Sequence, residues 1–347
     1  MKAVVLQQGN KFALEDVPKP QIKVPGDALI RVTTAAICGS DLHAKHGFIP
    51  GCEPGTVIGH EFVGIVEEIG SQVTRFKPGE RVACPPATWC GICPACKRGE
   101  QQYCPNGGVW GGGEIFGKGL GGAQAEYIRV AYADNCLCRI PEHVPDEQAV
   151  FVGDVFSTGF HAAYEGHIKA GDTVVLYGCG PIGLGALISA WLFGPKQVVA
   201  VDMLANRLDL AARYGATVLD GSKVNVPEAI REMTGGEGAD VAIEAIGNPQ
   251  TFVQALQSVR RGGTVSVVGI FPGPVEIPLN QLAYYGVKIG MGLGNISRMR
   301  QLMGLVETGR VDLAPMATQS FTLEKALEAY DLFEYHKDQC LKVLLKP

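Results

Sequence analysis

Four cysteines stand close together in one segment of the chain, CGICPACKRGEQQYC, at Cys90, Cys93, Cys96 and Cys104. Four thiolates can complete a tetrahedral zinc site with no open coordination position, and such a site stabilises the fold without taking part in a reaction. A disulfide framework would need an oxidising compartment, which nothing in the sequence indicates. An iron–sulfur cluster is the sharper alternative, because Pro105 follows the last cysteine as in ferredoxin-type runs. Those runs, however, place about three residues between the last two cysteines, where this chain has seven, so the spacing favours structural zinc.

A second group of possible metal ligands precedes this segment. The motif CGSDLH contains Cys38, and GHE contains His60. A single cysteine is usually a small buried hydrophobic residue, and a lone histidine is more often structural than a ligand. Catalytic zinc, however, takes three protein ligands and leaves a fourth position for water or substrate. Cys38 and His60 would supply two of the three, and the third must come from elsewhere in the chain.

A glycine-rich motif is suited to bind a dinucleotide. The pattern G-x-G-x-x-G lies between a β-type run, 173–177, and a helical run. In that context the first glycine allows a tight turn, the second lets the backbone approach a pyrophosphate, and the third lets helix and strand pack closely. The helix start adds amide donors for the phosphates. The residues expected to contact the cofactor are Gly178, Gly180, Pro181, Ile182 and Gly183.

An acidic residue about twenty positions further on favours NAD over NADP. Asp202 closes the run VVAVD, where its carboxylate can accept both ribose hydroxyls and would repel a 2′-phosphate. Arg207 follows five residues later and could soften this preference by reaching the ribose. The alternative is that the glycines form ordinary turns and Asp202 caps a helix. The order of strand, glycines, helix, strand and acid argues against that alternative.

Length and composition exclude several classes of protein. With 347 residues the chain is too long for one ordinary core and predicts two domains. A net charge of −5 makes nucleic acid an unsuitable partner. The uncharged stretch 173–195 is long enough to span a bilayer, but its glycines and proline predict a strand, turn and helix instead. The odd number of cysteines, 11, and the short apolar run at the N-terminus indicate a reduced, cytoplasmic protein without a membrane partner.

Two halves with different patterns must position these motifs. Residues 1–150 contain many short β-branched or alternating runs between glycine and proline turns, which predicts a β-rich domain. From about residue 151 strands alternate with helical runs, which predicts a parallel sheet with helices on both faces. TFVQALQSVRRG is one of the expected helices. The alternation weakens near residue 290, and the C-terminal part predicts helices and a final strand, CLKVLLK.

In these motifs and their order, the chain resembles the zinc-containing medium-chain alcohol dehydrogenases. The shared features are CGSDLH, GHEFVGIVEEIG, the four-cysteine segment, STGFHAA and the glycine-rich unit, and they cover essentially the full length. The resemblance implies an α/β fold with a GroES-like β-rich catalytic domain, residues 1–153 and 294–347. A Rossmann domain with a doubly wound parallel sheet, residues 154–293, is inserted into it. The segment 288–294 lies where relatives extend their sheet across a subunit interface, so we expect a homodimer or homotetramer.

The resemblance also completes the second metal site. In such enzymes Cys38, His60 and the residue at Asp154, in GDVFSTGFHA, ligate a catalytic zinc ion. Many members have cysteine at this third position, and aspartate resembles the secondary-alcohol and formaldehyde branches. Exchange of a thiolate for a carboxylate makes the zinc harder and more Lewis-acidic without abolishing binding. The alternative is that Asp154 caps the following helix.

Three further residues receive catalytic roles from the resemblance. Glu61 lies beside the zinc as a neighbouring or exchangeable ligand, Ser40 touches the zinc-bound oxygen of the substrate, and His43 forms the outer end of a proton relay. A histidine with a pKa near neutrality suits that task. The alternatives stay open: Glu61 could be an ordinary buried, paired carboxylate, Ser40 a helix cap, and His43 an exposed loop histidine.

These features together predict an enzyme with two zinc ions per chain, one catalytic and one structural. The enzyme would transfer a hydride between NAD and a small alcohol or carbonyl compound, and a secondary alcohol is the favoured substrate. Polyol, threonine and formaldehyde dehydrogenases resemble the chain almost as well. A non-catalytic relative is the other class of alternative, although all three catalytic-zinc positions can bind a metal. Candidates for the substrate pocket are Trp110, Phe116, Phe160 and His161.

Overall fold

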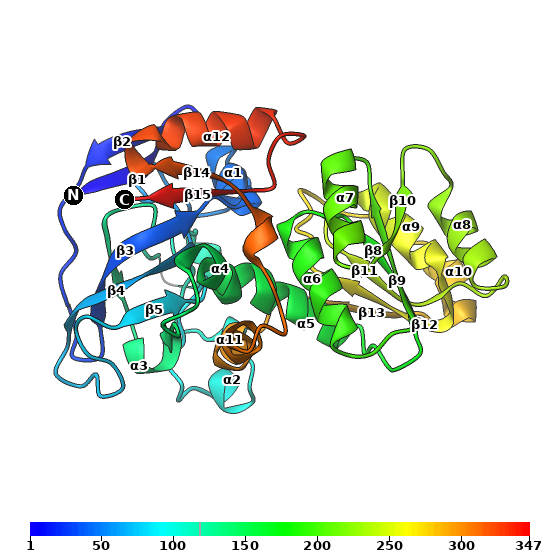
Figure 1. Ribbon diagram of the computed structural model, residues 1–347, viewed down its shortest axis with the longest axis horizontal. Coiled ribbons are helices and arrows are strands. Elements are labelled where there is room, and N and C mark those ends of the chain that lie inside the picture. The colour runs from blue at the N-terminus through cyan, green and yellow to red at the C-terminus, as the bar shows by residue number, and fades with distance from the viewer. Residues whose placement is uncertain (118) are drawn as a thin grey trace. The chain divides into compact units, whose positions relative to one another are not determined.

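The computed structural model describes residues 1–117 and 119–347, apart from the side chains of residues 116 and 281. The chain folds into two compact units (Figure 1). The first comprises Met1–Asp154 and Asn295–Pro347, and the second comprises Val155–Gly294. The second unit is therefore an insertion into the first.

The first unit is built on a mostly antiparallel sheet with the order β14-β15-β3-β4-β5-β7, in which β6 also pairs with β3. Its central strands are nearly continuous runs of buried apolar residues, as expected for strands covered on both faces. The strands are β3 (Ala28–Ala36), β4 (Glu61–Ile69), β5 (Arg81–Cys84), β6 (Tyr127–Val130), β7 (Cys138–Arg139), β14 (Ala317–Thr322) and β15 (Lys342–Lys346).

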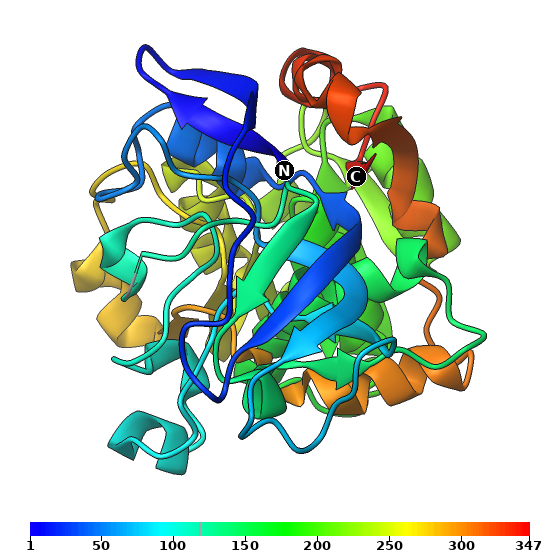
Figure 2. The ribbon, with the colours of Figure 1, turned by 90° about the vertical axis from the view of Figure 1, so that its left-hand side faces the viewer.

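Short helices and a separate hairpin surround this sheet. Helix α12 lies beside the hairpin of β1 and β2 (Figure 2), where the rings of Phe12 and Tyr330 are 4.4 Å apart. The hairpin consists of β1 (Lys2–Gln7) and β2 (Lys11–Asp16). The helices are α1 (Gly39–Lys45), α2 (Pro94–Lys97), α3 (Ala133–Cys136), α4 (Asp146–Phe151), α11 (Met299–Glu307) and α12 (Ala326–Tyr335).

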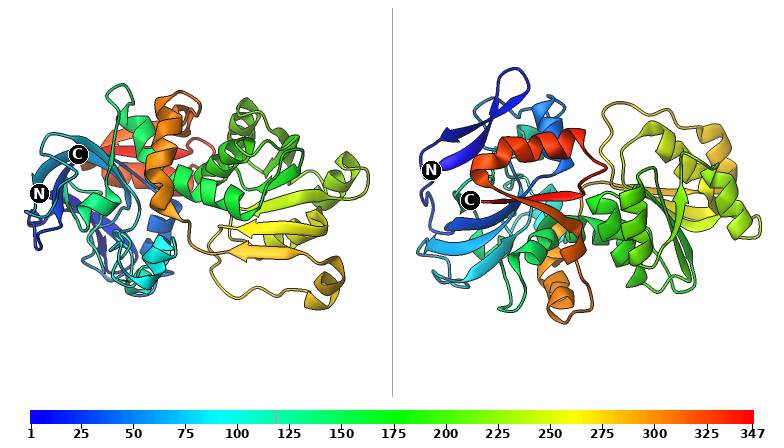
Figure 3. Two further views of the ribbon diagram at one scale, coloured as in Figure 1. Left: turned by 90° about the horizontal axis from the view of Figure 1, so that it is seen from below. Right: turned by 45° about the horizontal axis from the view of Figure 1, so that its top comes forward.

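The second unit confirms the expected doubly wound parallel sheet. Its strand order is β10-β9-β8-β11-β12-β13, and every pair is parallel. The parallel course of β12 and β13 is visible in the left panel of Figure 3. The strands are β8 (Thr173–Tyr177), β9 (Gln197–Asp202), β10 (Thr217–Asp220), β11 (Ala239–Glu244), β12 (Val259–Val267) and β13 (Lys288–Met291).

Helices cover both faces of this parallel sheet. Figure 1 shows α6 and α7 on one side and α8, α9 and α10 on the other. On the latter side Val175 and Val199 of the sheet pack in one core with Ile230 of α8 and Phe252 of α9. The helices are α5 (Ser157–Glu165), α6 (Pro181–Trp191), α7 (Ala205–Arg213), α8 (Val226–Met233), α9 (Pro249–Ser258) and α10 (Leu279–Tyr285).

The uncharged stretch 173–195 divides into β8, the glycine turn and α6. Within the described ranges, no helix combines the length and apolar character needed to cross a membrane. One predicted helix was too long: α9 ends at Ser258, and the following VRRG belongs to β12. Two glycines after the arginines disfavour helix. This segment is held against β11 instead. Val259 pairs with Ala239, and Arg260 Nε donates a hydrogen bond of 2.6 Å to Asp240.

The four-cysteine segment forms a small lobe of the first unit around α2 and a 3₁₀ turn, Gln101–Tyr103. All four sulfurs lie within 4.8 Å of one another. The Sγ atom of Cys104 is 3.6 Å from that of Cys90 and 3.8 Å from that of Cys93. A tetrahedral site with Zn–S bonds of about 2.3 Å separates its sulfurs by about 3.8 Å. The cluster therefore has the dimensions of a four-thiolate zinc site.

Hydrogen bonds favour a thiolate at Cys90, whereas burial and a hydrogen bond with Cys93 raise the pKa of Cys96 to about 12. Asn106 Nδ2 donates to Cys90 Sγ at 3.4 Å, and the amide of Cys96 donates to Cys93 Sγ at 3.5 Å. Burial opposes ionisation of Cys90, but the Asn106 side chain and neighbouring backbone amides lower its pKa to about 6. All eleven cysteines of the chain, each of them described, are free thiols, so the cluster forms no disulfide.

We predict that Cys96→Ser lowers the zinc content by about one ion per chain and lowers Tm by more than about 5 °C, because metal binding holds together a lobe with little secondary structure. Elemental analysis and thermal unfolding measure both effects. Cys340→Ser is the matched control, since this buried thiol of the same unit donates to the Leu332 and His336 carbonyls, as a serine hydroxyl can. A Cys96→Ser protein with unchanged zinc content and Tm would exclude a structural metal in the lobe.

Candidate active site

The sheet of the first unit brings three of the expected site residues together. Cys38 follows β3 and is the N-cap residue of α1, while His60 directly precedes β4. Because β3 and β4 are antiparallel, with Ala36 opposite Glu61, the end of one strand lies beside the start of the other. This pairing places Cys38 close to His60 and Glu61.

Asp154 reaches the same position from a helical segment. Helix α4 continues into a π-helical turn, Val152–Phe156, and α5 begins immediately afterwards. Asp154 lies inside this continuous helical backbone and not at a helix start, so the capping interpretation does not hold. Such π turns are frequent at functional sites. Gly153 allows close packing here, because a Cβ atom on it would lie 2.1 Å from the backbone oxygen of Cys84.

Four ligand-capable side chains converge within 4.8 Å of one another: Cys38, His60, Glu61 and Asp154. His60 Nε2 lies 3.5 Å from Asp154 Oδ2 and 4.0 Å from Glu61 Oε1. All three of these residues are less than 10% exposed. Sulfur, imidazole and carboxylate donors are those found in catalytic zinc sites. The residues therefore fit a zinc ion bound by Cys38, His60 and Asp154, with Glu61 alongside.

A buried network fixes the orientation of His60. Its Nδ1 lies 3.4 Å from Asp41 Oδ1, so Nε2 faces the other potential ligands. Asp41 Oδ2 accepts hydrogen bonds from the Cys38 amide at 2.9 Å and from Gln124 Nε2 at 3.0 Å, and Tyr330 donates to Gln124 Oε1 at 2.7 Å. A carboxylate on the far nitrogen of a ligating histidine fixes its tautomer and raises its basicity.

Asp41 was missed at the level of sequence, although a signal was present. It is the third residue of α1, where its side chain and Cys38 form a reciprocal capping box. The acid of CGSDLH could therefore have been assigned to the helix start beside Cys38. Its partners Gln124 and Tyr330 lie far away along the chain, and no local pattern marks them.

The negative electrostatic potential at the cluster of Cys38, His60, Glu61 and Asp154 favours binding of a cation. Burial alone would lower the pKa of His60, but the charge of Cys38 and hydrogen bonds with Asp154 and Asp41 raise it well above its ordinary value. One imidazole is thus surrounded by three acidic partners. A divalent cation bound there would satisfy the same negative charges.

Ser40 and His43 both lie on α1. Ser40 Oγ is 3.3 Å from His60 Nε2, which places the hydroxyl at the cluster. His43 is half-buried, and its ring packs edge-on against Phe48, with 6.1 Å between the ring centres. Burial, with smaller contributions from His46 and Lys337, lowers the pKa of His43. His43 is therefore neither a loop residue nor fully exposed, and it favours the neutral form at pH 7.

Glu61 is both part of the cluster and one half of a buried ion pair. Lys342 Nζ donates to Glu61 Oε1 and, at 2.9 Å, to the carbonyl of Ile37. Burial would lower the pKa of Lys342, but the Glu61 carboxylate raises it above its ordinary value, so the ammonium stays charged. The sequence placed Lys342 in the final strand and gave no sign that it reaches Glu61.

In the second unit the glycine turn joins β8 to α6, with Gly180 as N-cap and Pro181 in the first turn. Gly178 has a φ of +94°, which a side chain would strain, and a Cβ on Gly183 would lie 1.8 Å from the Gly178 carbonyl. A Cβ on Gly180, by contrast, would meet only Arg207, at 4.0 Å. The first and third glycines are thus required by packing, and the second leaves open space for a ligand. Ile182 is half-buried beside them.

Asp202 and Arg207 meet beside this turn. Asp202 Oδ2 accepts a hydrogen bond of 2.8 Å from the amide of Cys179, and Oδ1 accepts two from the backbone that leads into α7. Arg207 Nη1 lies 3.8 Å from Asp202 Oδ2. Arg207 Nε is buried and has no hydrogen-bond partner in the described part of the chain. The carboxylate therefore stands next to the glycine turn, with a cation close enough to reduce its repulsion of a phosphate.

The aromatic pocket candidates have different outcomes. Trp110 is 1% exposed, donates to the Pro85 carbonyl at 2.9 Å and packs edge-on against Phe62, so it belongs to the core and cannot line an open pocket. The side chain of Phe116 lies outside the described residues. Phe160 packs against Phe193, 5.5 Å between ring centres, on the helical face of the second unit.

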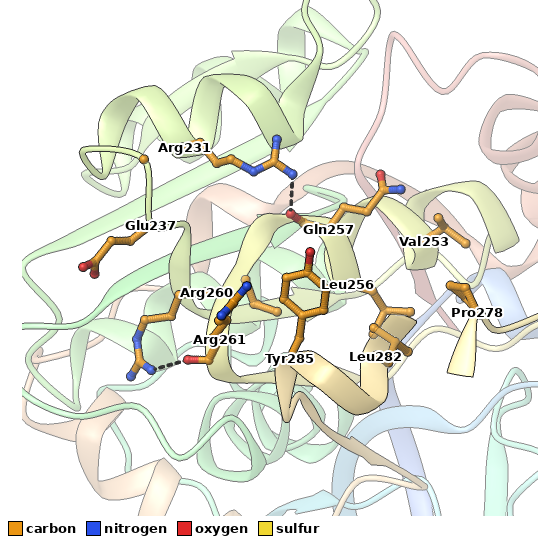
Figure 4. A pocket seen from close by; sticks show the side chains of 12 residues that line it. Arg231, Glu237, Val253, Leu256, Gln257, Arg260, Arg261, Pro278, Leu282 and Tyr285 are labelled. Carbon is orange, nitrogen blue, oxygen red and sulfur yellow. Dashed lines mark hydrogen bonds between the residues drawn. The ribbon is translucent and has the colours of Figure 1, made fainter. Parts of the chain in front are cut away.

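His161 belongs to the same helix, α5, and its Nδ1 lies 4.0 Å from Glu165 Oε1. A cavity of about 810 Å³ in the second unit lies away from all these residues. It is lined by α8, α9, α10 and the start of β12 (Figure 4), at the end of the sheet where the strands begin, whereas the glycine turn follows the end of β8. Its arginines are engaged with the protein itself, as Arg231 donates to the Gln257 carbonyl and Arg260 to that of Arg261. None of the expected site residues lines this cavity, so it is not the candidate active site.

Comparisons with known proteins agree with both units. The model of the alcohol dehydrogenase GroES-like domain matches residues 24–142, and that of the zinc-binding dehydrogenase matches residues 181–308. An alcohol dehydrogenase of Cupriavidus necator is 37% identical over 368 residues, covering 100% of this chain and 99% of that protein.

Solved structures give the same result. The alcohol dehydrogenase TADH of Thermus sp. ATN1 superimposes with a TM-score of 0.94 at 38% identity, covering 100% of this chain and 99% of that one. A zinc-binding dehydrogenase of Sinorhizobium meliloti, solved with bound NADP, gives a TM-score of 0.87 at 31% identity, covering 100% and 99%. With matches over its whole length and in both units, the chain belongs to the zinc-containing medium-chain alcohol dehydrogenase family.

Proposed function

We propose that the protein interconverts a small secondary alcohol and its ketone, with zinc as the catalytic metal and NAD as the hydride carrier. The observation that supports this most is the convergence of Cys38, His60 and Asp154 within 4.8 Å, in a family of oxidoreductases. Aspartate as third ligand supports a secondary alcohol, because this residue resembles the secondary-alcohol branch as well as the formaldehyde branch. A polyol, threonine or formaldehyde substrate is the alternative within the same reaction class.

The chain's own residues account for binding, orientation and proton movement. Zinc held by Cys38, His60 and Asp154 would supply Lewis acidity toward the substrate oxygen, and NAD would supply the hydride acceptor. Asp41 keeps His60 Nε2 directed at the cluster. Near-complete burial of the polar side chains keeps water from competing with the substrate.

Proton transfer falls to Ser40 and His43. Ser40 Oγ lies beside His60 Nε2 and can accept a hydrogen bond from a substrate hydroxyl. His43, on the same helix, has a lowered pKa and is therefore ready at neutral pH to accept a proton on a ring nitrogen. We propose that it passes this proton toward solvent.

We predict that Cys38→Ala removes about one zinc ion per chain and lowers turnover by more than about a thousandfold, while circular dichroism and Tm stay close to wild type. A panel of primary, secondary and polyhydric alcohols, each with NAD and NADP, identifies the substrate class. Cys52→Ala is the control, because this half-buried thiol lies outside the cluster. Undiminished turnover by a Cys38→Ala protein that lacks one zinc would exclude the assignment. Wild-type protein with two zinc ions and no turnover on the panel would favour a non-catalytic relative.

For the cofactor we infer a preference for NAD that Arg207 moderates. Asp202 lies beside the glycine turn, where it can accept the ribose hydroxyls, and the guanidinium 3.8 Å away reduces its repulsion of NADP. The NADP in the Sinorhizobium meliloti protein shows that this fold accommodates the phosphorylated cofactor in at least one member.

We predict that Asp202→Asn raises KM for NAD by about 10- to 100-fold, the loss expected for hydrogen bonds to a charged acceptor, and lowers KM for NADP. Asp209→Asn is the control, because Asp209 lies exposed on the same helix as Arg207. Steady-state kinetics with both cofactors measure the ratio. If Asp202→Asn left the ratio of the two KM values unchanged, Asp202 would not select the cofactor.

We also infer a homodimer or homotetramer. Strand β13 forms one edge of the second unit's sheet, so its outer backbone groups can pair with another strand. Exposed apolar side chains accompany it, with Met291 70% and Tyr284 85% exposed. Isologous pairing of β13 with a second copy would cover both the edge and these side chains.

The free cysteines further favour a reducing cytoplasmic setting.

We predict that Met291→Glu lowers the mass of the sedimenting particle from oligomer to monomer. At a two-fold interface the new carboxylate would be buried next to the same carboxylate of the second copy, and the two charges would repel each other. Val224→Glu is the control, since Val224 is a 42%-exposed apolar residue between β10 and α8 of the same unit. A monomeric wild-type protein, or a Met291→Glu protein with unchanged mass, would count against this interface.

A further inference from the structure

Lys342 is a buried cation that the reaction described above does not use. Lys342 is 1% exposed and is the first residue of β15, which pairs with β3 near Ala36. Its Nζ donates to Glu61 Oε1 and to the Ile37 carbonyl. Both partners stand at the strand ends that carry Cys38 and His60. The lysine therefore contacts the group of potential metal ligands from β15, at the end of the sheet that carries them.

Glu61 uses only one of its two oxygens in this pair. Its Oε2 is buried and has no hydrogen-bond partner in the described part of the chain. A buried acceptor left unpaired is costly, because it gives up its hydrogen bonds to water. The same carboxylate is one of four groups within 4.8 Å that can ligate a metal. Glu61 is thus placed beside the ion site, and Lys342 holds its Oε1, the oxygen that also lies 4.0 Å from His60 Nε2.

The charges of the cluster explain why a lysine is needed. Ionised Cys38, Asp154 and Glu61 carry three negative charges, and a divalent cation neutralises only two of them. The Lys342 ammonium compensates the third, so the four potential ligands, the ion and the lysine together carry no net charge, which limits the cost of burying them. The Asp41 carboxylate lies behind His60 and is held by hydrogen bonds from the Cys38 amide and Gln124. Without the lysine, the metal ion would be the nearest cation to the Glu61 carboxylate and would attract it as a ligand.

Coordination of Glu61 would have a functional consequence. A zinc ion with four protein ligands has the closed arrangement of a structural site, whereas a catalytic site keeps one position open. We propose that Lys342 is a positioning residue that holds Glu61 off the metal and so keeps a coordination position open for the substrate. This inference rests on the proposed zinc site of Cys38, His60 and Asp154.

The test uses the full-length protein loaded with cobalt(II), whose visible spectrum reports ligand number and type. Imidazole serves as the probe, because it can bind the metal only where a position is open. The four-cysteine site is closed and contributes a constant background. The variants are Lys342→Met, Lys342→Arg and the double variant Lys342→Met with Glu61→Gln.

We predict that wild type and Lys342→Arg change their cobalt spectra on addition of imidazole, and that Lys342→Met does not, because Glu61 occupies the open position. Turnover of Lys342→Met falls by about 10- to 100-fold, the usual effect of losing a group that orients a metal ligand. The double variant regains the imidazole response, because a neutral amide is a poor zinc ligand. Release of cobalt to a chelator should not be faster in Lys342→Met than in wild type.

Several outcomes would overturn the proposal. An imidazole response of wild-type size in Lys342→Met, or none in the double variant, would show that Lys342 does not control Glu61. If Lys342→Met fails to fold, Lys342→Gln carries the same comparison, since its amide can still donate to Ile37. A wild-type cobalt protein without any imidazole response would instead contradict the open metal site, and with it the proposed function.

Discussion

The antiparallel pairing of β3 with β4 is the constraint on which the candidate active site depends. It sets Ala36 opposite Glu61, and the residues just outside this pair are those that carry chemistry. Cys38 and His60 are 22 positions apart in sequence, yet the sheet makes them neighbours. β15 joins the other side of β3 and brings Lys342 to the same end. A slip of one residue in either pairing would turn these side chains to the opposite face of the sheet.

Local motifs could be predicted from the sequence, and contacts between distant segments could not. The alternation of strands and helices gave the parallel sheet, and the glycine spacing gave the turn where β8 meets α6. The helix predicted for TFVQALQSVRRG was too long, because Val259 pairs with Ala239 and the arginines that follow it belong to β12. Trp110 could have been exposed in its glycine-rich segment, but it is packed against Phe62. In each case tertiary packing outweighed the local pattern.

The same division holds within the site. Cys38, His60 and the four clustered cysteines are recognisable by residue type and spacing, and Asp154 by its place in a family motif. The residues that orient them are not: Asp41 could have been found from its position in α1, but Gln124, Tyr330 and Lys342 have no distinguishing neighbours in sequence. Ligands are restricted by chemistry to a few residue types, whereas many residues can supply a supporting hydrogen bond. Supporting residues therefore leave a weaker trace in the sequence.

The two metal clusters differ in how much of the fold each one needs. Cys90, Cys93, Cys96 and Cys104 belong to one short segment, so a metal ion can organise that lobe with little help from the sheet. The other cluster takes its donors from a loop, a strand start and a π-helical turn, which meet only after β3, β4 and α4 have packed. The first site can therefore gain its full set of ligands locally, and filling all four positions stabilises it. The second is already held in place by the surrounding structure, which allows a ligand position to be left open and a carboxylate to be restrained beside it.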